Sequence, residues 1–503
     1  MIVIAPSDPV AGDLLPLGSM LAFHAARDPD SPAVTCDGVT ITHAALDARS
    51  NRKARHLARH GVGAQDIVTV ALPNGLEFYE TAFAIWKLGA TINPISSKLP
   101  AAEIAAIIGL ARPVLVVGVA PGEGASWPYL AAGAEPDPDL SDAPLPAIIP
   151  TIWRIMTSGG STGRPKLIVD RKPGLFDPMK PDLLMTQGET MLNPGPLYHS
   201  SPLVMTTSCI ATGGHVVEMG RFDALRALEL IERHRVGWVN LVPTMMHRIA
   251  RLPADQRLRF DVSSLRVVFH MAAPCPVWLK EQWIAWLGPE KIFELYGGTE
   301  LFGTTLITGP EWLTHRGSVG RVVPGAQMCV LDDRGRRCAP GAVGEIHFRP
   351  DVPRDPDAIY IGASPALRDG WLSYGDLGHM DAEGYLYLVE RRTDLILSGG
   401  ANIYPAEVEA ALDRHPDVHS SIVVGLPDED LGQRVHAIVQ LAPDAGARTD
   451  ADALRAFLAD RLVRYKIPRS FEFTTQPLRD DAGKARRTKL RDDRIATGAQ
   501  ELP

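Results

Sequence analysis

Residues 157–166 read TSGGSTGRPK and directly follow the strand-like segment TIWRIM at 151–156. Their three glycines let the backbone turn sharply and approach an anion closely. Consecutive backbone N–H groups in such a turn form an anion-binding nest, while hydroxyl and ammonium groups add donors and positive charge. The side chains concerned are Ser158, Ser161, Thr162 and Lys166. This stretch predicts a strand followed by a loop that holds the phosphates of a nucleotide.

The loop differs from two familiar phosphate-binding motifs. No lysine follows Gly163 directly, so the GxxxxGK[ST] spacing of a P-loop fails, and the sequence is not GxGxxG. A flexible polar hairpin is the alternative for such a loop taken alone, although the closing Pro165 and Lys166 disfavour it. The assignment therefore depends on other segments of the chain.

Composition is that of an ordinary globular protein. The chain has 503 residues, of which 45% are hydrophobic and 22% charged, and this length suggests three or so domains or subdomains. No apolar run reaches the ~18 residues that a membrane-spanning helix needs, and the N-terminus lacks the basic residues of a secretory leader. We therefore expect a cytoplasmic protein with no membrane span.

Charge and cysteine content exclude further classes. The net charge of −8 gives no reason to expect nucleic acid or an anionic membrane as a partner. The five cysteines are scattered, and their odd number precludes a complete intramolecular disulfide framework. We expect Cys36, Cys209, Cys275, Cys329 and Cys338 to be reduced and mostly structural.

Helical and strand-like segments alternate along the first third, for example a helix between an N-cap at Thr42 and a stop at Gly61. This order predicts an α/β fold with parallel strands. Residues 120–150 are rich in Pro, Gly and Asp and predict a surface connection, and 330–390 are strand-like. We expect a large N-terminal domain of several subdomains over 1–392 and a small α+β domain over 393–503, whose basic tail at 484–494 forms a solvated face.

Four further segments are polar or glycine-rich where loops are expected. In ELYGGTE at 294–300, Tyr296 can stack on a base, while Thr299 and Glu300 can meet a phosphate and its Mg²⁺. In the segment at 374–392, Asp376 suits the hydroxyls of a ribose, and Arg391 follows fifteen residues later. The alternative for the segment at 294–300 is an ordinary Gly-Gly turn with a surface Glu, and the alternative for 374–392 is a β-hairpin with solvated charges.

The last two segments lie near the C-terminus. Gly399 and Gly400 have no side chains, so the backbone there can lie close to a narrow ligand. The alternative is that they form only a turn between a strand and a helix. Lys484 follows Gly483 in a polar loop and could reach a distant site. Taken alone, such a Gly-Lys pair is typical of an exposed surface loop with no catalytic role.

In this order, the five motifs resemble those of the adenylate-forming superfamily, which comprises acyl-CoA synthetases, nonribosomal peptide synthetase adenylation domains and luciferases. The resemblance runs from Thr157 to Lys484. It implies ATP, Mg²⁺ and coenzyme A as cofactors. A carboxylic acid would attack the α-phosphate, giving an acyl-adenylate and pyrophosphate, and a thiol would then take the acyl group after rotation of the small domain.

The resemblance also implies a role for each motif. The loop would bind the β- and γ-phosphates, and Thr162 and Glu300 would hold Mg²⁺. Thr299 would touch the α-phosphate, and Lys484 would bridge it to the acid. The residues expected to bind the cofactors are Thr157, Ser158, Gly159, Gly160, Ser161, Thr162, Gly163, Lys166, Ala272, Ala273, Pro274, Tyr296, Gly297, Asp376, Arg391, Gly399 and Gly400. Those expected to act in catalysis are Lys484, Thr299, Glu300 and the pocket-gating His199, with the domain hinge at Thr393.

The chain departs from the family pattern at four positions. Gly159 stands where a Ser is usual, and Leu167 where a Gly commonly follows the lysine. Thr393 replaces the usual Asp or Lys of the hinge, and Ala401 replaces a common Glu. The first two bear on the mobility of the loop, and Thr393 bears on the ease of domain rotation.

The acid-binding segment NPGPLYHSSPL at 193–203 lacks the Asp with which relatives pair an amino-acid substrate. No carrier module follows Lys484, which favours free coenzyme A as acceptor. The expected pocket is apolar, partly small and partly adaptable: Pro196, Val204, Met205, Val242, Met245, Met271, Ala272 and Gly297. It suggests a bulky hydrophobic acid, and the loop sequence looks most like that of ligases for bile acids, steroid side chains and polycyclic diterpenoid acids.

Several alternatives stay open. The acid could be a fatty or aryl acid, and the acceptor a carrier protein. A luciferase-like oxygenase and a non-catalytic nucleotide-binding protein are the other readings, although the intact set of motif residues argues against the second. Monomer and homodimer both stay open.

Overall fold

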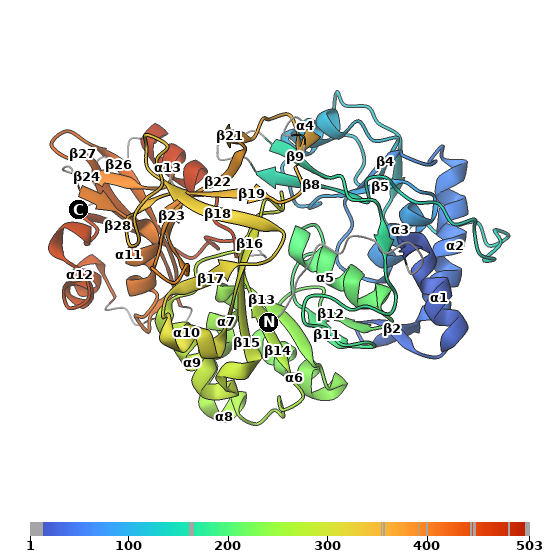
Figure 1. Ribbon diagram of the computed structural model, residues 1–503, viewed down its shortest axis with the longest axis horizontal. Helices are drawn as coiled ribbons and strands as arrows, with labels where there is room; N and C mark the ends of the chain where they lie inside the picture. Colours follow the sequence, from blue (N-terminus) through green and yellow to red (C-terminus); the bar gives the residue numbers. More distant parts are fainter. Residues whose placement is uncertain are drawn as a thin grey trace.

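The computed structural model describes residues 14–159, 165–353, 355, 358–391, 393–398, 401–442, 445, 449–480 and 483–497, without the side chains of Ser158, Gly159 and Arg391. Two large sheets and the helices around them form the first part of the chain (Figure 1). The C-terminal residues form a smaller unit beside them, drawn in orange and red. The expected fold class, a large α/β N-terminal domain with a small α+β C-terminal domain, is confirmed.

The first sheet contains β8, the strand that leads into TSGGSTGRPK, and has the strand order β20-β9-β8-β5-β4-β6-β7. Its central strands are parallel, as the helix–strand alternation predicted, whereas β8 and β9 form an antiparallel hairpin. The strands are β4 (Ile67–Val70), β5 (Thr91–Pro94), β6 (Leu115–Gly118), β7 (Tyr129–Ala131), β8 (Arg154–Gly159), β9 (Pro165–Asp170) and β20 (Tyr360–Ile361). β7 lies inside the predicted surface connection.

The helices of this part of the chain are α1 (Met20–Arg27), α2 (His43–Arg59), α3 (Leu76–Lys87) and α4 (Ala101–Ala111). α2 is the helix predicted between Thr42 and Gly61. The Thr42 side chain accepts a hydrogen bond from the N–H of Ala45, so it caps α2 as expected.

The second sheet begins with six parallel strands and continues as an antiparallel series. The parallel strands are β2 (Pro32–Cys36), β12 (His215–Glu218), β11 (Thr190–Asn193), β13 (Trp238–Leu241), β14 (Val267–His270) and β15 (Ile292–Gly297), with β3 (Val39–Thr42) antiparallel at the edge. The antiparallel strands are β16 (Thr304–Thr308), β17 (Ser318–Val322), β23 (Leu386–Arg391), β22 (Trp371–Met380), β21 (Ala366–Arg368), β19 (Gly344–Pro350) and β18 (Ala326–Leu331). The strand-rich character predicted for 330–390 is confirmed.

The helices of this half are α5 (Ser200–Ala211), α6 (Ala224–His234), α7 (Pro243–Ala250), α8 (Ala254–Arg257), α9 (Val277–Leu287) and α10 (Gly309–Thr314). A two-residue pair, β1 (Leu15–Pro16) and β10 (Leu175–Phe176), lies apart from both sheets. Among the described residues, no helix combines the length and the apolar character needed to cross a bilayer.

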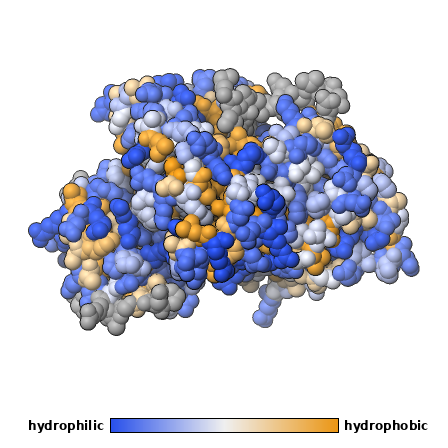
Figure 2. All heavy atoms as spheres, turned by 90° about the horizontal axis from the view of Figure 1, so that it is seen from below, coloured by the Kyte–Doolittle hydropathy of each residue, from blue (hydrophilic) through white to orange (hydrophobic). Residues whose placement is uncertain are grey.

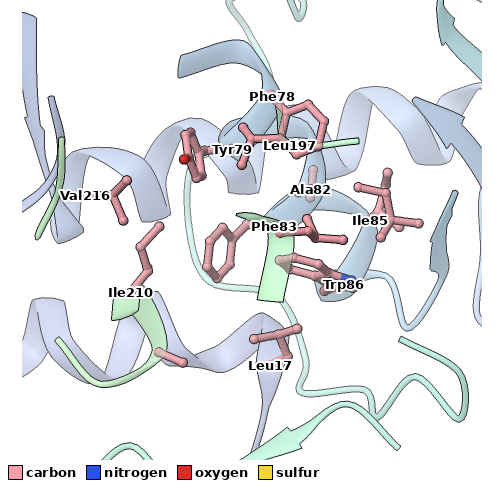
Figure 3. Close-up of a cluster of buried hydrophobic side chains, with 14 of the residues drawn as sticks. Leu17, Phe78, Tyr79, Ala82, Phe83, Ile85, Trp86, Leu197, Ile210 and Val216 are labelled. Carbon is pink, nitrogen blue, oxygen red and sulfur yellow. The ribbon is translucent and has the colours of Figure 1, made fainter. Parts of the chain in front are cut away.

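A buried cluster joins the two halves, with α3 at its centre (Figure 3). Phe78, Phe83 and Trp86 of this helix lie in one cluster with Leu197 and Ile210 of the other half. Each such side chain stabilises the fold by about 1.5–3 kcal/mol when fully buried. Because Leu197 belongs to the predicted acid-binding segment, that segment rests directly on the core.

The small unit has its own hydrophobic core, which includes Val408, Leu412, Val423 and Leu454. A three-stranded sheet lies at its centre, with β26 antiparallel and β28 parallel to β27. Its elements are β24 (Ile396–Ser398), β25 (Ala401–Ile403), α11 (Pro405–Leu412), β26 (Val418–Asp428), β27 (Gly432–Leu441), α12 (Ala451–Ala459), β28 (Ser470–Thr474) and α13 (Arg487–Ala496).

The prediction of a solvated basic tail is wrong for two arginines of α13. The Arg487 guanidinium lies 2.8 Å from a Glu409 carboxylate oxygen and 3.6 Å from one of Glu390, and its side chain is only 14% exposed. Arg494 lies 2.6 Å from Glu472. The acidic partners come from distant segments, so the local charge run could not reveal these pairs.

Seen from below, the molecule shows hydrophilic residues around most of its outline and hydrophobic residues gathered toward the middle of this face (Figure 2). The five cysteines are free thiols, and Cys36, Cys209 and Cys329 are buried, in line with a structural role.

Candidate active site

The carboxyl ends of the parallel strands in the second sheet lie along one edge, where ligands bind in open α/β sheets. β11 ends at Asn193, β13 at Leu241, β14 at His270 and β15 at Gly297. The predicted acid-binding and adenine-binding segments all lie at these strand ends. The segments at 193–203 and 294–300 contain a strand end, and Val242 and Ala272 follow one within two residues. The topology therefore gathers segments that lie up to about a hundred residues apart in the sequence.

The stem of the predicted phosphate loop is the hairpin of β8 and β9, in which Thr157 pairs with Leu167 and Ser158 with Lys166. Asn93 fixes it from the neighbouring strand by donating to the Ile155 carbonyl at 3.0 Å. Gly160, Ser161, Thr162 and Gly163 lie outside the described residues. The described part of the hairpin therefore ends where the predicted loop begins.

Lys166 and Glu300 lie together, as their two motifs required. Lys166 Nζ is 3.3 Å from a Glu300 carboxylate oxygen, and the two side chains are 25% and 11% exposed. The Tyr360 hydroxyl donates to the same Glu300 oxygen at 2.6 Å, and the lysine nitrogen lies 3.9 Å from the centre of the Tyr360 ring. Burial and the Glu300 charge raise the pKa of Tyr360, so its phenol stays a neutral donor.

Sequence reasoning missed Tyr360. It lies in the short strand β20, which pairs with β9 so that Tyr360 faces Ile168 across the ladder. No motif surrounds it, and it lies 194 positions after Lys166 in the sequence. Only the pairing of the two strands brings it to the site.

Tyr296 and Asp376, predicted to meet adenine and ribose, are joined by a hydrogen bond from the tyrosine hydroxyl to the carboxylate at 2.7 Å. Asp376 also pairs with Arg391 in the ladder of β22 and β23, so the two predicted ribose residues are neighbours. Tyr296, Phe348 and Tyr374 form an aromatic cluster with centroid distances of 5.5–6.2 Å.

The Gly-Gly turn of ELYGGTE is required by its neighbours. A side chain on Gly297 would meet a Thr304 methyl group at 2.6 Å, and one on Gly298 would meet the Tyr374 ring at 2.3 Å. Thr299 and Glu300 follow directly, so close packing of these glycines sets the position of the two predicted catalytic residues.

Ala272, Ala273 and Pro274 follow β14 at the same edge. Ala272 has a φ of +73°, a left-handed conformation that costs a non-glycine residue about 1–3 kcal/mol and tends to occur at functional sites. Below this turn, Lys280 donates to Glu294 at 2.6 Å within the core, and His270 Nε2 lies 3.8 Å from the same carboxylate. Burial lowers the pKa of His270 well below its usual value, so it is neutral.

The predicted acid pocket is assembled from loop ends and two helices. The Ser201 hydroxyl, at the start of α5, lies 3.3 Å from the Met205 sulfur and 3.2 Å from the Met271 sulfur, so its single proton can be donated to either. Both methionines are buried, as are Val242 and Met245. Pro196 lies in the loop before α5, and His199 is the N-cap residue of that helix, with its ring 4.6 Å from the Tyr198 ring.

The C-terminal lysine loop lies against this pocket. Gly483 has a φ of +74°, and a β-carbon there would lie 2.5 Å from Thr244 Oγ1 and 3.3 Å from a Val242 methyl group. Lys484 follows at once, and its N–H donates to Asp480 at 2.9 Å. The small unit therefore presents the predicted catalytic lysine at the wall of the predicted acid pocket.

Other predicted residues of the small unit are only partly described. Thr393 is exposed between β23 and β24, and its hydroxyl donates to Asp394 at 3.3 Å. Gly399 and Gly400 lie outside the described residues. The described part of the chain contains no group of three or more His, Cys, Asp or Glu side chains arranged to hold a metal ion.

Comparison with known proteins agrees with this geometry. The sequence matches the family of AMP-binding enzymes over residues 21–351 and the AMP-binding enzyme C-terminal domain over residues 407–484. It is 31% identical to the fatty acid–[acyl-carrier-protein] ligase ScoC of Streptomyces coeruleorubidus, covering 94% of this chain and 95% of that protein. Identity to feruloyl-CoA synthase of Amycolatopsis sp is 32%, covering 94% of this chain and 98% of the synthase.

A solved structure agrees with the fold. The o-succinylbenzoate CoA synthetase of Bacillus subtilis, in complex with its acyl-adenylate intermediate, superimposes with a TM-score of 0.79. The two sequences are 27% identical, and the match covers 95% of this chain and 98% of the other.

Proposed function

Since the chain belongs to the family of AMP-binding enzymes, we propose that it joins a bulky hydrophobic carboxylic acid to coenzyme A. The class of reaction is that of the acyl-CoA ligase branch: an AMP-forming acid–thiol ligase that uses ATP, Mg²⁺ and coenzyme A. The observation that carries the proposal is the packing of Gly483 against Thr244 and Val242, because Lys484 then follows directly beside a residue predicted to line the acid pocket.

In the first step, the acid carboxylate attacks the α-phosphate and pyrophosphate leaves. Two anions must meet, so preorganised cations have to offset their repulsion, and each such group is typically worth about 3–4 kcal/mol. Lys166 would meet the departing phosphates, and Lys484 would meet the carboxylate and the α-phosphate. Thr299 would donate to the same phosphate, and Asp376 with Arg391 would hold the ribose.

Glu300, whose carboxylate lies beside the stem of the loop, fits a magnesium ion. Mg²⁺ takes one or two protein carboxylates and keeps water and substrate phosphate oxygens as its other ligands, so the Glu300 carboxylate suffices on the protein side. Thr162 is the second proposed ligand. Bound there, the ion supplies positive charge to the triphosphate.

In the second step, the thiol of coenzyme A attacks the acyl-adenylate, so Lys484 must leave the site and the thiol must enter it. We place the boundary between residues 392 and 393 and the hinge at Thr393, which lies between the two units. Rotation there would withdraw Lys484 and bring the segment of Gly399 and Gly400 toward the adenylate, where it would line the path of the pantetheine arm. His199, at the start of α5, would gate the acid pocket.

The apolar side chains predicted to line the acid pocket support a hydrophobic acid. Met205, Met245 and Met271 are unbranched and adapt to irregular shapes, and no acidic residue occurs in 193–203 to pair with an amino group. A polycyclic acid is the specific proposal. The names of relatives include feruloyl-CoA synthase and a fatty acid–[acyl-carrier-protein] ligase, so aryl and linear acids are the competing substrates.

The test is pyrophosphate release with Mg-ATP over amino, aryl, linear and polycyclic acids, each with and without coenzyme A. Release that is largest with a polycyclic acid, together with a thioester that forms only with coenzyme A, is the expected result. A linear or aryl acid that reacts much faster than any polycyclic acid would refute the polycyclic proposal. Amino-acid-dependent release would refute the hydrophobic acid altogether.

A carrier protein is the second candidate acceptor, because one relative is named a ligase for acyl carrier protein. Both acceptors share the adenylation step, so pyrophosphate release cannot distinguish them. The distinguishing measurement is transfer of a radiolabelled acyl group to coenzyme A or to a phosphopantetheinylated carrier protein. Transfer only to the carrier protein would replace coenzyme A as the acceptor.

A further inference from the structure

A buried carboxyl group lies beneath the acid-binding segment, outside every motif described above. Glu218 is the last residue of β12 and is 3% exposed. It accepts a hydrogen bond from the Tyr79 hydroxyl, one at 2.8 Å from the Asn74 amide, and bonds at 2.8 and 3.0 Å from the Asn193 amide. Three side chains from α3, from the loop before it and from β11 therefore converge on one carboxyl group.

The two amides connect Glu218 to the acid-binding segment. Asn74 donates to the Gly195 carbonyl at 2.9 Å, and Asn193 donates to the same carbonyl at 3.0 Å. The Asn74 side-chain oxygen in turn accepts from the N–H of Leu197 at 2.9 Å. Pro196, a predicted wall of the acid pocket, is therefore held by side-chain hydrogen bonds on both of its neighbours.

Each amide is oriented by this arrangement. An asparagine has two donors and one acceptor oxygen, and Asn74 directs its N–H groups to Glu218 and Gly195 while its oxygen meets Leu197. If the carboxyl group were lost, either amide could rotate, and the contacts to Gly195 and Leu197 would go with it.

A carboxyl group at this depth is costly unless it is paired. Burial raises the pKa of Glu218 to about 8, and the bonds from Tyr79, Asn193 and Asn74 oppose that rise. An apolar side chain would fill the same volume without this cost. The arrangement is therefore better explained by orientation of the amides than by packing alone.

We propose that Glu218 is a positioning residue for the acid substrate, which acts through Asn74 and Asn193 on the backbone around Pro196. The proposal rests on the ligase function proposed above. It concerns only the binding of the acid, because no described contact of Glu218 leads to Lys166, Glu300 or Asp376.

The test compares Glu218→Gln with Tyr79→Phe in steady-state pyrophosphate release. Glu218→Gln keeps the volume but replaces an acceptor oxygen with an NH₂ group that faces donors. Tyr79→Phe removes one bond to the same carboxyl group and leaves both amides and their bonds to Gly195. We expect Glu218→Gln to raise the KM for the acid at least tenfold while the KM for Mg-ATP changes less than twofold, and Tyr79→Phe to leave the KM for the acid within twofold.

Other outcomes separate the explanations. An unchanged KM for the acid in a folded Glu218→Gln enzyme would overturn the proposal, and so would equal rises for acid and Mg-ATP. If Glu218→Gln does not fold, Asn74→Ala, which removes the bonds to Gly195 and Leu197, must show the same selective rise or the proposal fails. Lack of release by the wild-type enzyme with every acid would instead refute the ligase function.

Discussion

Lys166 Nζ lies 3.3 Å from Glu300 Oε1, so the stem of the phosphate loop and the end of ELYGGTE meet in one ion pair. The lysine is proposed to bind phosphates and the glutamate to bind Mg²⁺. The two charged groups proposed to act on the triphosphate and its Mg²⁺ therefore lie together. The same pair is contacted by Tyr360, which no motif predicted.

Replacing Tyr360 with Phe removes the 2.6 Å hydrogen bond to Glu300 but keeps the ring beneath Lys166. A hydrogen bond to a charged group contributes about 1.5–3 kcal/mol, so we expect the KM for Mg-ATP to rise roughly tenfold or more. The KM for the acid should stay within twofold. A Tyr360→Phe enzyme with unchanged dependence on Mg-ATP would show that the phenol does not orient Glu300.

Lys484→Ala should reduce acyl-adenylate formation by ~10²–10³-fold, because a preorganised cation is lost from the reacting groups. The thioester step, measured with preformed acyl-adenylate and coenzyme A, should be largely retained, since Lys484 is proposed to leave the site before that step. Lys489, on the exposed side of α13, offers a control, and Lys489→Ala should retain both steps. Equal loss in both half-reactions of the Lys484 variant would contradict rotation of the small domain.

Gly298→Ala should abolish most of the activity. The new methyl group would lie 2.3 Å from the Tyr374 ring and 2.7 Å from Glu300 Oε2, so the turn that carries Thr299 and Glu300 must move. We expect a loss in kcat/KM of at least 100-fold, in line with the cost of misplacing a catalytic group by about 1 Å. A Gly298→Ala enzyme with near wild-type kcat/KM would show that the turn tolerates displacement.

Gly109→Ala provides the matched control for that substitution. Gly109 lies in α4, and a β-carbon there meets nothing within 4 Å. Alanine favours a helix over glycine by about 0.8–1.0 kcal/mol. This variant should keep full activity and melt at a slightly higher temperature.

A fall in pH should destabilise the folded large unit, because its buried histidines stay neutral there. His43 is fully buried, and burial, with His24 beside it, lowers its pKa to about 4. His43 therefore takes up a proton near pH 6.5 in the unfolded chain but only near pH 4 in the folded chain. The free energy of unfolding falls as the pH falls from about 6.5 to 4. The loss from one such group is about 1.4 kcal/mol per pH unit.

Melting temperatures between pH 7.5 and 5 should reveal this dependence. His43→Asn should melt lower at pH 7.5, because the contact of His43 with the Gly214 carbonyl at 3.2 Å is altered, but with a shallower decline toward pH 5. An unchanged decline would assign the acid sensitivity to other groups.

The sequence by itself determined the features that depend on local chemistry. The cap at Thr42, the alternation that sets parallel strands, and the strand before TSGGSTGRPK all follow from backbone preferences of neighbouring residues. The order of the five motifs predicted which loops would meet, and the ion pair of Lys166 and Glu300 and the bond of Tyr296 to Asp376 agree with it.

Only the tertiary structure decided the partners that come from unrelated segments. Tyr360 contacts Glu300 because β20 pairs with β9. Glu218 accepts hydrogen bonds from Asn74 and Asn193, which lie in separate segments of the sequence. Arg487 forms an ion pair with Glu409, which is distant from it in the sequence. Periodicity predicts that a residue is buried or polar, but it carries no information about which distant group satisfies it. A buried charge or amide must be paired to be tolerated, and that pairing exists only once the strands and loops have assembled.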